Sequence, residues 1–418
     1  MKKILTTIIA WLLLSAFIIE DPIQLSVKDI LASTLRERRF VTSQRNIDFA
    51  NGLNYRLPIL SDLGFKYGAD DLIKSKQQYA MSLGFNSFRK IREQLAIKNA
   101  QINLYLAKKD ILTNQVIKER YKDIADVYCS QLIINSQKKL DTLLNLRNVA
   151  FKTALQTGAN VKIKDLVETE EDMRKLRAEL AETQNIWAIG QQRIQDYMGT
   201  EQAVALNFDN FLTVPKLQTI LQTLKLTRNW QTPEVKTREN QVALAQAELR
   251  LEDADFHQIF DGVQFIYEKA PATDLAIKDF SFRLGFKVPL KGNFRPKQNE
   301  LLLDIKQAEN DYAFLAHETE RAVKMQVLKV ENALKLYREC KDKRDNNLAK
   351  NLLNTPSVYV TLAATDIVDL RVLQQKKEID LAQIHYKLIS EYLTLLDMTG
   401  SLVYTPYKNY LSDSLEKW

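Results

Sequence analysis

Two stretches of the chain, KIKDLVETEEDMRKLRAELAETQNIWAIGQQRIQDYMG at residues 162–199 and AATDIVDLRVLQQKKEIDLAQIHYKLISEYLTLLDMTG at residues 363–400, decide the fold. They align without a gap at an offset of 201 residues (363 minus 162), which carries Asp165 onto Asp366. An internal period of about half the chain predicts two equivalent structural halves rather than a solenoid of short repeats.

Long helices are expected to make up most of each half. The 418 residues include only 11 glycines and 9 prolines, so few positions interrupt a helix, and strong helix formers dominate the composition. Apolar residues recur every seven positions from Leu166 to Ile194, which is typical of a coiled coil. We therefore predict helices over 25–52, 89–157, 162–199, 233–260, 294–354 and 363–399.

Four segments between these helices alternate apolar and polar residues, as in Phe280, Phe282, Leu284 and Phe286. Strands of this kind fit a half-buried soluble sheet, and they also fit a membrane barrel around a wet lumen. Four strands cannot close a barrel, since small barrels need about eight, but three copies of the chain would supply twelve. The strands are expected at about 53–68, 77–88, 262–269 and 279–290.

The N-terminus has the pattern of a secretory signal peptide, because two lysines precede an apolar run and acidic residues follow it. We assign residues 1–20 to this signal, with an uncleaved anchor as the alternative. Export favours the membrane barrel. The first repeat then occupies 21–200 and the second 232–400. A connecting segment lies at 201–231, and the tail at 401–418 receives no assignment.

The composition argues against an enzyme and against nucleic-acid binding. Basic and acidic residues are interleaved, and the net charge is only +7, whereas nucleic-acid binders concentrate basic residues on one face. Cys129 and Cys340 are expected to be free thiols, and the three histidines lie on different predicted helices. We find no motif for a catalytic residue, a cofactor or a bound metal, and predict none of the three.

The order of these elements resembles the TolC-type outer-membrane factors over roughly residues 25–400. The marks that carry the resemblance are each weak and gain weight from their order. They are Gly158 with Asp165–Val167, Thr232–Glu234, Val288–Leu290, and the acidic step at Asp366–Leu370.

The resemblance implies a mainly α fold, in which long antiparallel coiled-coil hairpins form a tunnel. Four strands per chain form a third of a 12-stranded trimeric membrane barrel. It implies a homotrimer in the outer membrane of a Gram-negative-type bacterium, with its helices in the periplasm and its barrel among outer-membrane lipids. Such a protein is a passive exit duct of a tripartite efflux pump or a type I secretion system. Its partners are a periplasmic adaptor and an inner-membrane transporter.

The resemblance also implies a gate at the periplasmic end of the tunnel. Asp366 and Asp369 lie one helical turn apart and share a face, and Asp165 and Glu168 occupy the equivalent places in the first half. In a trimer each position becomes a ring of carboxylates. The alternative is that acids near a helix start only stabilise the helix dipole.

The hairpin tips are expected to contact the adaptor, and the sequence departs from the family pattern there. The first tip turns at Gly158, but the second has Thr355, Pro356 and Ser357 and no glycine. The basic residue expected shortly before Asp366 is also missing. A second function stays open: a periplasmic coiled-coil adaptor or scaffold that never enters the outer membrane.

Overall fold

The computed structural model describes residues 22–69, 77–157, 162–226, 230–269, 280–288, 291–355 and 363–418. The expected signal peptide, and Gly158, Pro356 and Ser357 of the expected tips, lie outside these ranges. The mainly α fold with a small β part is confirmed. The chain forms two compact units: unit 1 comprises Met1–Phe40, Thr113–Trp230 and Glu320–Trp418, and unit 2 comprises Val41–Leu112 and Gln231–Thr319.

Unit 2 contains an antiparallel sheet of four strands. They are β2 (Leu60–Ala69), β3 (Gln77–Phe85), β5 (Phe260–Lys269) and β6 (Phe280–Phe286), in the order β2-β3-β5-β6. The hairpin of the first repeat therefore lies beside the hairpin of the second, joined where β3 pairs with β5. Within the described residues β2 and β6 each have a neighbour on one side only, so both edges of the sheet are open.

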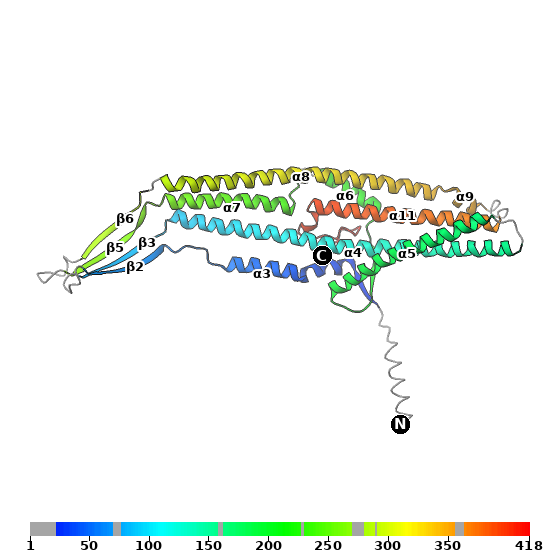
Figure 1. Cartoon of the computed structure of the whole chain (residues 1–418), viewed down its shortest axis with the longest axis horizontal. Coiled ribbons are helices and arrows are strands. Elements are labelled where there is room, and N and C mark those ends of the chain that lie inside the picture. Colours follow the sequence, from blue (N-terminus) through cyan, green and yellow to red (C-terminus); the bar gives the residue numbers. More distant parts are fainter. Residues whose placement is uncertain are drawn as a thin grey trace, which may run out of the picture. The chain divides into compact units, whose positions relative to one another are not determined.

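The helical part of unit 2 repeats the order of the strands. It is built from α3 (Arg38–Gly52), the first part of α4 (Phe88–Gln156), α7 (Pro233–Phe256) and the first part of α8 (Lys291–Asp345). Polar contacts join each helix to the next: Lys98 Nζ donates to the carbonyl oxygen of Asn51, Arg250 pairs with Glu93, and Lys297 pairs with Glu252. These helices form one layer in the order α3-α4-α7-α8 (Figure 1).

Unit 1 holds the larger apolar core. Its elements are β1 (Ile23–Ser26) paired in parallel with β4 (Val204–Asn207), α2 (Val27–Ala32), α5 (Ile163–Met198), α6 (Val214–Leu226), α9 (Leu348–Asn354), α11 (Ala364–Met398) and the rest of α4 and α8. Ile117 and Ile124 of α4, and Leu388 and Tyr392 of α11, are fully buried in this core.

The C-terminal tail belongs to this core. The Tyr121 hydroxyl donates to the carbonyl oxygen of Lys408 at 2.7 Å and accepts from the backbone N–H of Tyr410 at 3.0 Å. Leu402 and Leu411 of the tail are buried. The segment that the sequence left without an assignment therefore packs onto α4.

A second buried cluster explains the seven-residue period. Met173 of the predicted seam is buried with Leu176 against Leu140 and Leu144 of α4, and α11 contributes Val372 and Ile379. A narrow apolar stripe on each of three helices is thus removed from water, which is the arrangement that sustained heptads favour.

The predicted helix over 25–52 is wrong in its continuity. Residues 23–26 pair with β4, and Ser26 then starts α2 with a capping box, in which its side chain accepts from the Asp29 N–H. Residues 33–36 form a short 3₁₀ helix before α3 begins. Local caps and strand pairing override the apolar period here.

Two other predicted elements are shorter than expected. Helix 294–354 is divided, because Asn347 caps a new helix, α9, with its side chain accepting from Ala349 N–H. The strand predicted over 53–68 begins only at Leu60, which is opposite Phe85, the last residue of β3. Residues before Leu60 have no partner strand, and Pro58 has no N–H to donate.

Gly262 is predicted to be required for the sheet. The register of β5 against β6 shifts at a bulge between Phe260 and Gly262. A Cβ on Gly262 would lie 2.2 Å from the carbonyl oxygen of Leu83 on the neighbouring strand β3. Gly262→Ala should force the two strands apart and destabilise the protein by about 1–3 kcal/mol, measured by thermal unfolding in detergent. Gly68→Ala is the control, since its nearest neighbour would be 3.9 Å away; equal effects would contradict the close-approach argument.

Candidate functional site

The predicted acidic residues lie where two helices begin. Asp366 is in the first turn of α11 and Asp165 is in the first turn of α5. Neither helix has a side-chain cap on its N-cap residue, Ala363 or Lys162. Both acids are therefore suited to stabilise a helix dipole, which is the alternative that the sequence left open.

Asp369 is placed differently, because it has a charged partner. Its Oδ1 lies 2.8 Å from Nε of Arg147 on α4. Burial raises the pKa of Asp369 above its ordinary value; the Arg147 charge opposes this, while the negative charges of Asp366 and Asp165 raise it further. The structure thus brings three of the four predicted acids, from both repeats, within electrostatic reach of one another.

The other predicted residues do not join this group. Glu168 is exposed and pairs with Lys164 of its own helix at 3.6 Å. Thr355 caps α9, and its hydroxyl donates to the carbonyl oxygen of Asn351. Gly158, Pro356 and Ser357 lie outside the described residues.

Arg147 is the member of this site that the sequence reasoning missed. The basic partner was expected just before Asp366, but it comes from α4 in the other repeat. A signal was present, because Leu140, Leu144 and Phe151 form a buried stripe with helical spacing, and Arg147 occupies a position of that stripe. Its guanidinium lies over the Phe151 ring, 5.3 Å from the centroid.

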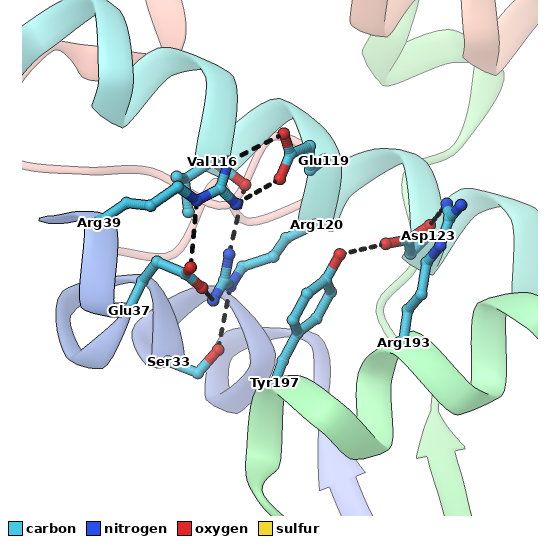
Figure 2. Close-up of polar contacts among 9 residues, drawn as sticks. All are labelled: Ser33, Glu37, Arg39, Val116, Glu119, Arg120, Asp123, Arg193 and Tyr197. Atoms are coloured by element: carbon cyan, nitrogen blue, oxygen red, sulfur yellow. Dashed lines mark hydrogen bonds and ion pairs between the residues drawn. The ribbon is translucent and has the colours of Figure 1, made fainter.

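A second polar cluster lies in unit 1 and centres on Arg120 of α4 (Figure 2). The Arg120 side chain is 1% exposed. Its Nε donates to the Ser33 hydroxyl at 3.0 Å, and its guanidinium pairs with Glu37 at 3.0 Å and lies over the Tyr197 ring. This one side chain therefore joins the N-terminal segment, α4 and the end of α5.

Asp123, one turn further along α4, extends the cluster. Its carboxylate accepts from the Tyr197 hydroxyl at 2.5 Å and from Arg193 at 2.9 Å (Figure 2). The side chain is only 2% exposed, and both oxygens have partners. A fully paired buried cluster fixes the helices relative to one another and leaves no group free for chemistry.

The described residues form few other candidate sites. Across the described ranges no three or more His, Cys, Asp or Glu side chains are arranged to hold a metal ion. No helix among these residues is long and apolar enough to span a membrane. His385 is largely buried between Tyr128 and Tyr337, and burial lowers its pKa. Cys129 is buried and Cys340 half-buried, both as free thiols.

Solved structures share the fold of this chain. The open-state outer-membrane channel MtrE of Neisseria gonorrhoeae matches with a TM-score of 0.61 at 12% identity, over 90% of this chain and 88% of that one. The outer-membrane channel OprN matches with a TM-score of 0.58 at 13% identity, over 90% and 89%. The outer-membrane protein VceC of Vibrio cholerae matches with 0.56 at 12%, over 90% and 96%.

The predicted resemblance to the outer-membrane factors is confirmed at the level of the fold by these matches. No protein-family model matches the chain, and no curated protein matches it significantly.

Arg120→Met should destabilise unit 1. The substitution removes the buried partner of Glu37 and leaves the carboxylate paired only with Arg39. Breaking a buried pair costs about 3–5 kcal/mol, and the remaining Arg39 pair should keep the loss near the lower end of that range. Thermal or denaturant unfolding of the purified protein measures the loss. Lys152→Met, also on α4, is the matched control: Lys152 pairs with Glu170 at the surface, where a pair contributes at most about 1 kcal/mol. A loss no larger than that of the control would contradict the role given to Arg120.

Proposed function

We propose that the chain is one subunit of a trimeric outer-membrane channel, which acts as a passive exit duct of a tripartite efflux pump or a type I secretion system. The observation that carries this proposal is the outer face of the unit 2 sheet. Large apolar side chains on this face stay exposed in the single chain, among them Phe65 at 73% and Phe282 at 56%. A face of this kind requires an apolar surrounding.

The apolar face is ordered in rows across the strands. Tyr67, Tyr79, Tyr267 and Phe280 are cross-strand neighbours at one end, and Phe85, Phe260 and Phe286 lie at the other. The two rows between them contain Leu63, Leu83, Val263 and Leu284, and Phe65, Met81, Phe265 and Phe282. Aromatic rows on both sides of an apolar band are typical of membrane barrels, whose aromatic residues lie at the two lipid–water interfaces.

The rows cover part of the height of a membrane band. Tyr79 and Phe85 are six residues apart on β3, so the outer rows are separated by about 20 Å along the strand. The apolar band of a membrane barrel is about 25 Å tall, and the usual strand tilt lowers the projected height of these rows to about 15 Å. The rows therefore lie within such a band.

The opposite face of the sheet suits a wet lumen. A hollow of about 450 Å³ lies over it, lined by polar and charged side chains that include Lys66, Ser82, Gln264 and Arg283. Alternation of apolar and polar residues along each strand places the two kinds on opposite faces. This division supports a barrel that faces lipid outside and water inside.

The open edges support the trimer. An exposed strand edge presents unpaired N–H and C=O groups, and these groups have no partner in lipid. Pairing of β2 of one copy with β6 of the next satisfies both edges, and three copies give a closed barrel of twelve strands. Two solved structures that share the fold are outer-membrane channels, which supports a channel built from these strands.

Asp165, Asp366 and Asp369 are proposed as the gate, and the residues around Gly158 and Thr355–Ser357 as the contact with a periplasmic adaptor. Glu168, three residues after Asp165 on α5 and paired with Lys164, is proposed as an outer member of the gate. An inner-membrane transporter supplies the energy and selects the cargo, so the channel needs no catalytic residue and no cofactor. The group at Asp369 supports this role, because carboxylates with mutual repulsion favour cations and repel anions.

The periplasmic adaptor or scaffold is the weaker alternative. A soluble protein of that kind would keep about ten large apolar residues of the sheet face in water, and contiguous exposed patches of that size are rare on soluble proteins.

Purified protein is expected to be a trimer and to conduct ions. It should be extracted with the outer membrane by detergent, have three times the mass of the chain by light scattering, and give discrete single-channel currents in planar bilayers. A monomer that stays in solution without detergent and gives no current would reject the channel in favour of the scaffold.

The double variant Asp366→Asn with Asp369→Asn should weaken block of the current by multivalent cations, because block requires the charged carboxylates. In the wild type, block should weaken as the pH falls, with a midpoint above the ordinary Asp value of 3.8, since the pKa of Asp369 is raised. Glu170→Gln with Asp172→Asn removes two charges from paired surface positions of α5 and should change nothing. Unchanged block in the first variant would remove these aspartates from the gate.

A further inference from the structure

We propose that Lys66 and Arg283 form an anion-binding station on the lumen face of the unit 2 sheet, where the barrel holds soluble multivalent oxyanions. The inference rests on the proposed channel and deepens it, because it names the charge class of solute that the barrel section favours. The proposed gate favours cations, so the two sections of the duct differ in the sign of the ions that they prefer.

Lys66 and Arg283 line the same hollow of the sheet. The hollow has a volume of about 450 Å³ and includes both side chains in its lining. Lys66 lies on β2 and Arg283 lies on β6, which are the two edge strands. Both residues are exposed, so the hollow has one cation on each side, with β3 and β5 between them.

The register of the strands places the two cations in neighbouring rows of one face. The row of Lys66 runs across the sheet through Ala80, Ile266 and Ser281. Arg283 is two residues from Ser281, so it belongs to the next row of the same face, about 7 Å along the strand. Three strand spacings separate β2 from β6, about 14 Å, so an anion over the two middle strands is attracted by both cations.

The floor of the hollow consists of small or neutral residues. In the row of Arg283 these are Gly64, Ser82 and Gln264. The Ser82 hydroxyl makes only a long contact, 3.4 Å, with the carbonyl oxygen of Gly64, and the amide of Gln264 carries two donors. The floor therefore offers neutral O–H and N–H donors to a bound anion.

The two cations have no ion-pair partner among the residues that the structure describes. Cations on the helices of unit 2 differ in this respect; Lys297, for example, pairs with Glu252 at 2.6 Å. Two unpaired cations that face one hollow repel each other, which opposes the stability of the sheet. A negatively charged ligand between them gives this placement a physical reason.

Two carboxylates lie at one end of the hollow. Asp62 is four residues before Lys66 on β2, about 13 Å along the strand, and it accepts from the Ser61 hydroxyl at 2.9 Å. Asp261 precedes Gly262, which lies in the row of Asp62. Both acids are therefore nearer to this end of the sheet than the two cations are.

A third carboxylate lies toward the other end. Glu268 is opposite Gln78, whose side chain donates to it at 2.6 Å. This row follows the row of Lys66 in the direction away from Asp62. The lumen face thus has a positive zone between two negative ends, and an anion in the hollow is held at its middle.

The two side chains suit an oxyanion with several charges. The guanidinium of Arg283 presents a planar fork of donors, which pairs bidentately with phosphate or carboxylate groups, whereas Lys66 adds a compact point charge. In the proposed trimer each copy would supply one such pair to the lumen. Rings of basic side chains select for anions in pores.

Block of single-channel currents by inorganic tripolyphosphate tests the station. The anion should block the wild-type channel in a dose-dependent way. Lys66→Gln with Arg283→Gln should raise the half-blocking concentration by roughly tenfold, because removal of the charges weakens the attraction for a multivalent anion. Asp62→Asn with Asp261→Asn should lower that concentration, since these acids repel the same anion.

Two further variants separate the effect of charge from effects on the fold. Lys66→Arg with Arg283→Lys keeps both charges and should retain most of the block. Lys306→Gln with Lys324→Gln removes two lysines that pair with acids of their own helix, α8, and should leave the half-blocking concentration unchanged.

The outcomes distinguish the station from the channel. If the protein is a conducting trimer and tripolyphosphate does not block it, or blocks the neutral variant equally, the station is wrong and the channel stands. An equal loss of block in the charge-preserving variant would also overturn the station, because charge would then not be the cause. If the protein is a monomer without current, the channel and the station fall together.

Discussion

The backbone groups at the two edges of the unit 2 sheet are the constraint on which the rest of the structure depends. A sheet of four strands that ends in β2 and β6 leaves a row of donors and acceptors unpaired on each side. The apolar face of the same sheet excludes water as their partner. Further strands satisfy both conditions, and the proposed pairing of β2 with β6 of another copy would supply them.

Much of the fold could be predicted from the sequence because its signals are repeated. The heptad residues from Leu166 to Ile194 follow a period of seven, and each of them is buried or half-buried in the structure. The apolar residues of β6 follow a period of two, and they all lie on one face of the sheet. The breaks in helices could not be predicted in the same way. Asn347 and Ser26 end the regular pattern through single side-chain hydrogen bonds to the backbone, and such bonds leave no periodic trace.

The candidate site, like the fold, could be predicted only in part from the sequence. Asp366 and Asp369 were predicted because they match acidic positions of the family that the chain resembles. The repeat then extended the prediction to the equivalent residues Asp165 and Glu168. Arg147 was missed because its partner is far away in sequence and belongs to the other repeat. Arg120 and Asp123 were missed for a related reason: a charged residue on a long helix is usually solvated, and only the packing of α2, α4 and α5 identifies these two as buried.

The place of the C-terminal tail has a consequence for folding. The core of unit 1 needs β1 from the start of the chain, α4 and α5 from its middle, and Tyr410 and Leu411 from its end. Contacts between residues so far apart in sequence form slowly, because the loop-closure entropy must be overcome first. Unit 2 ends at Thr319 and contains none of these late residues. During synthesis all residues of unit 2 are therefore present before the last residues of the unit 1 core, and unit 2 can fold first.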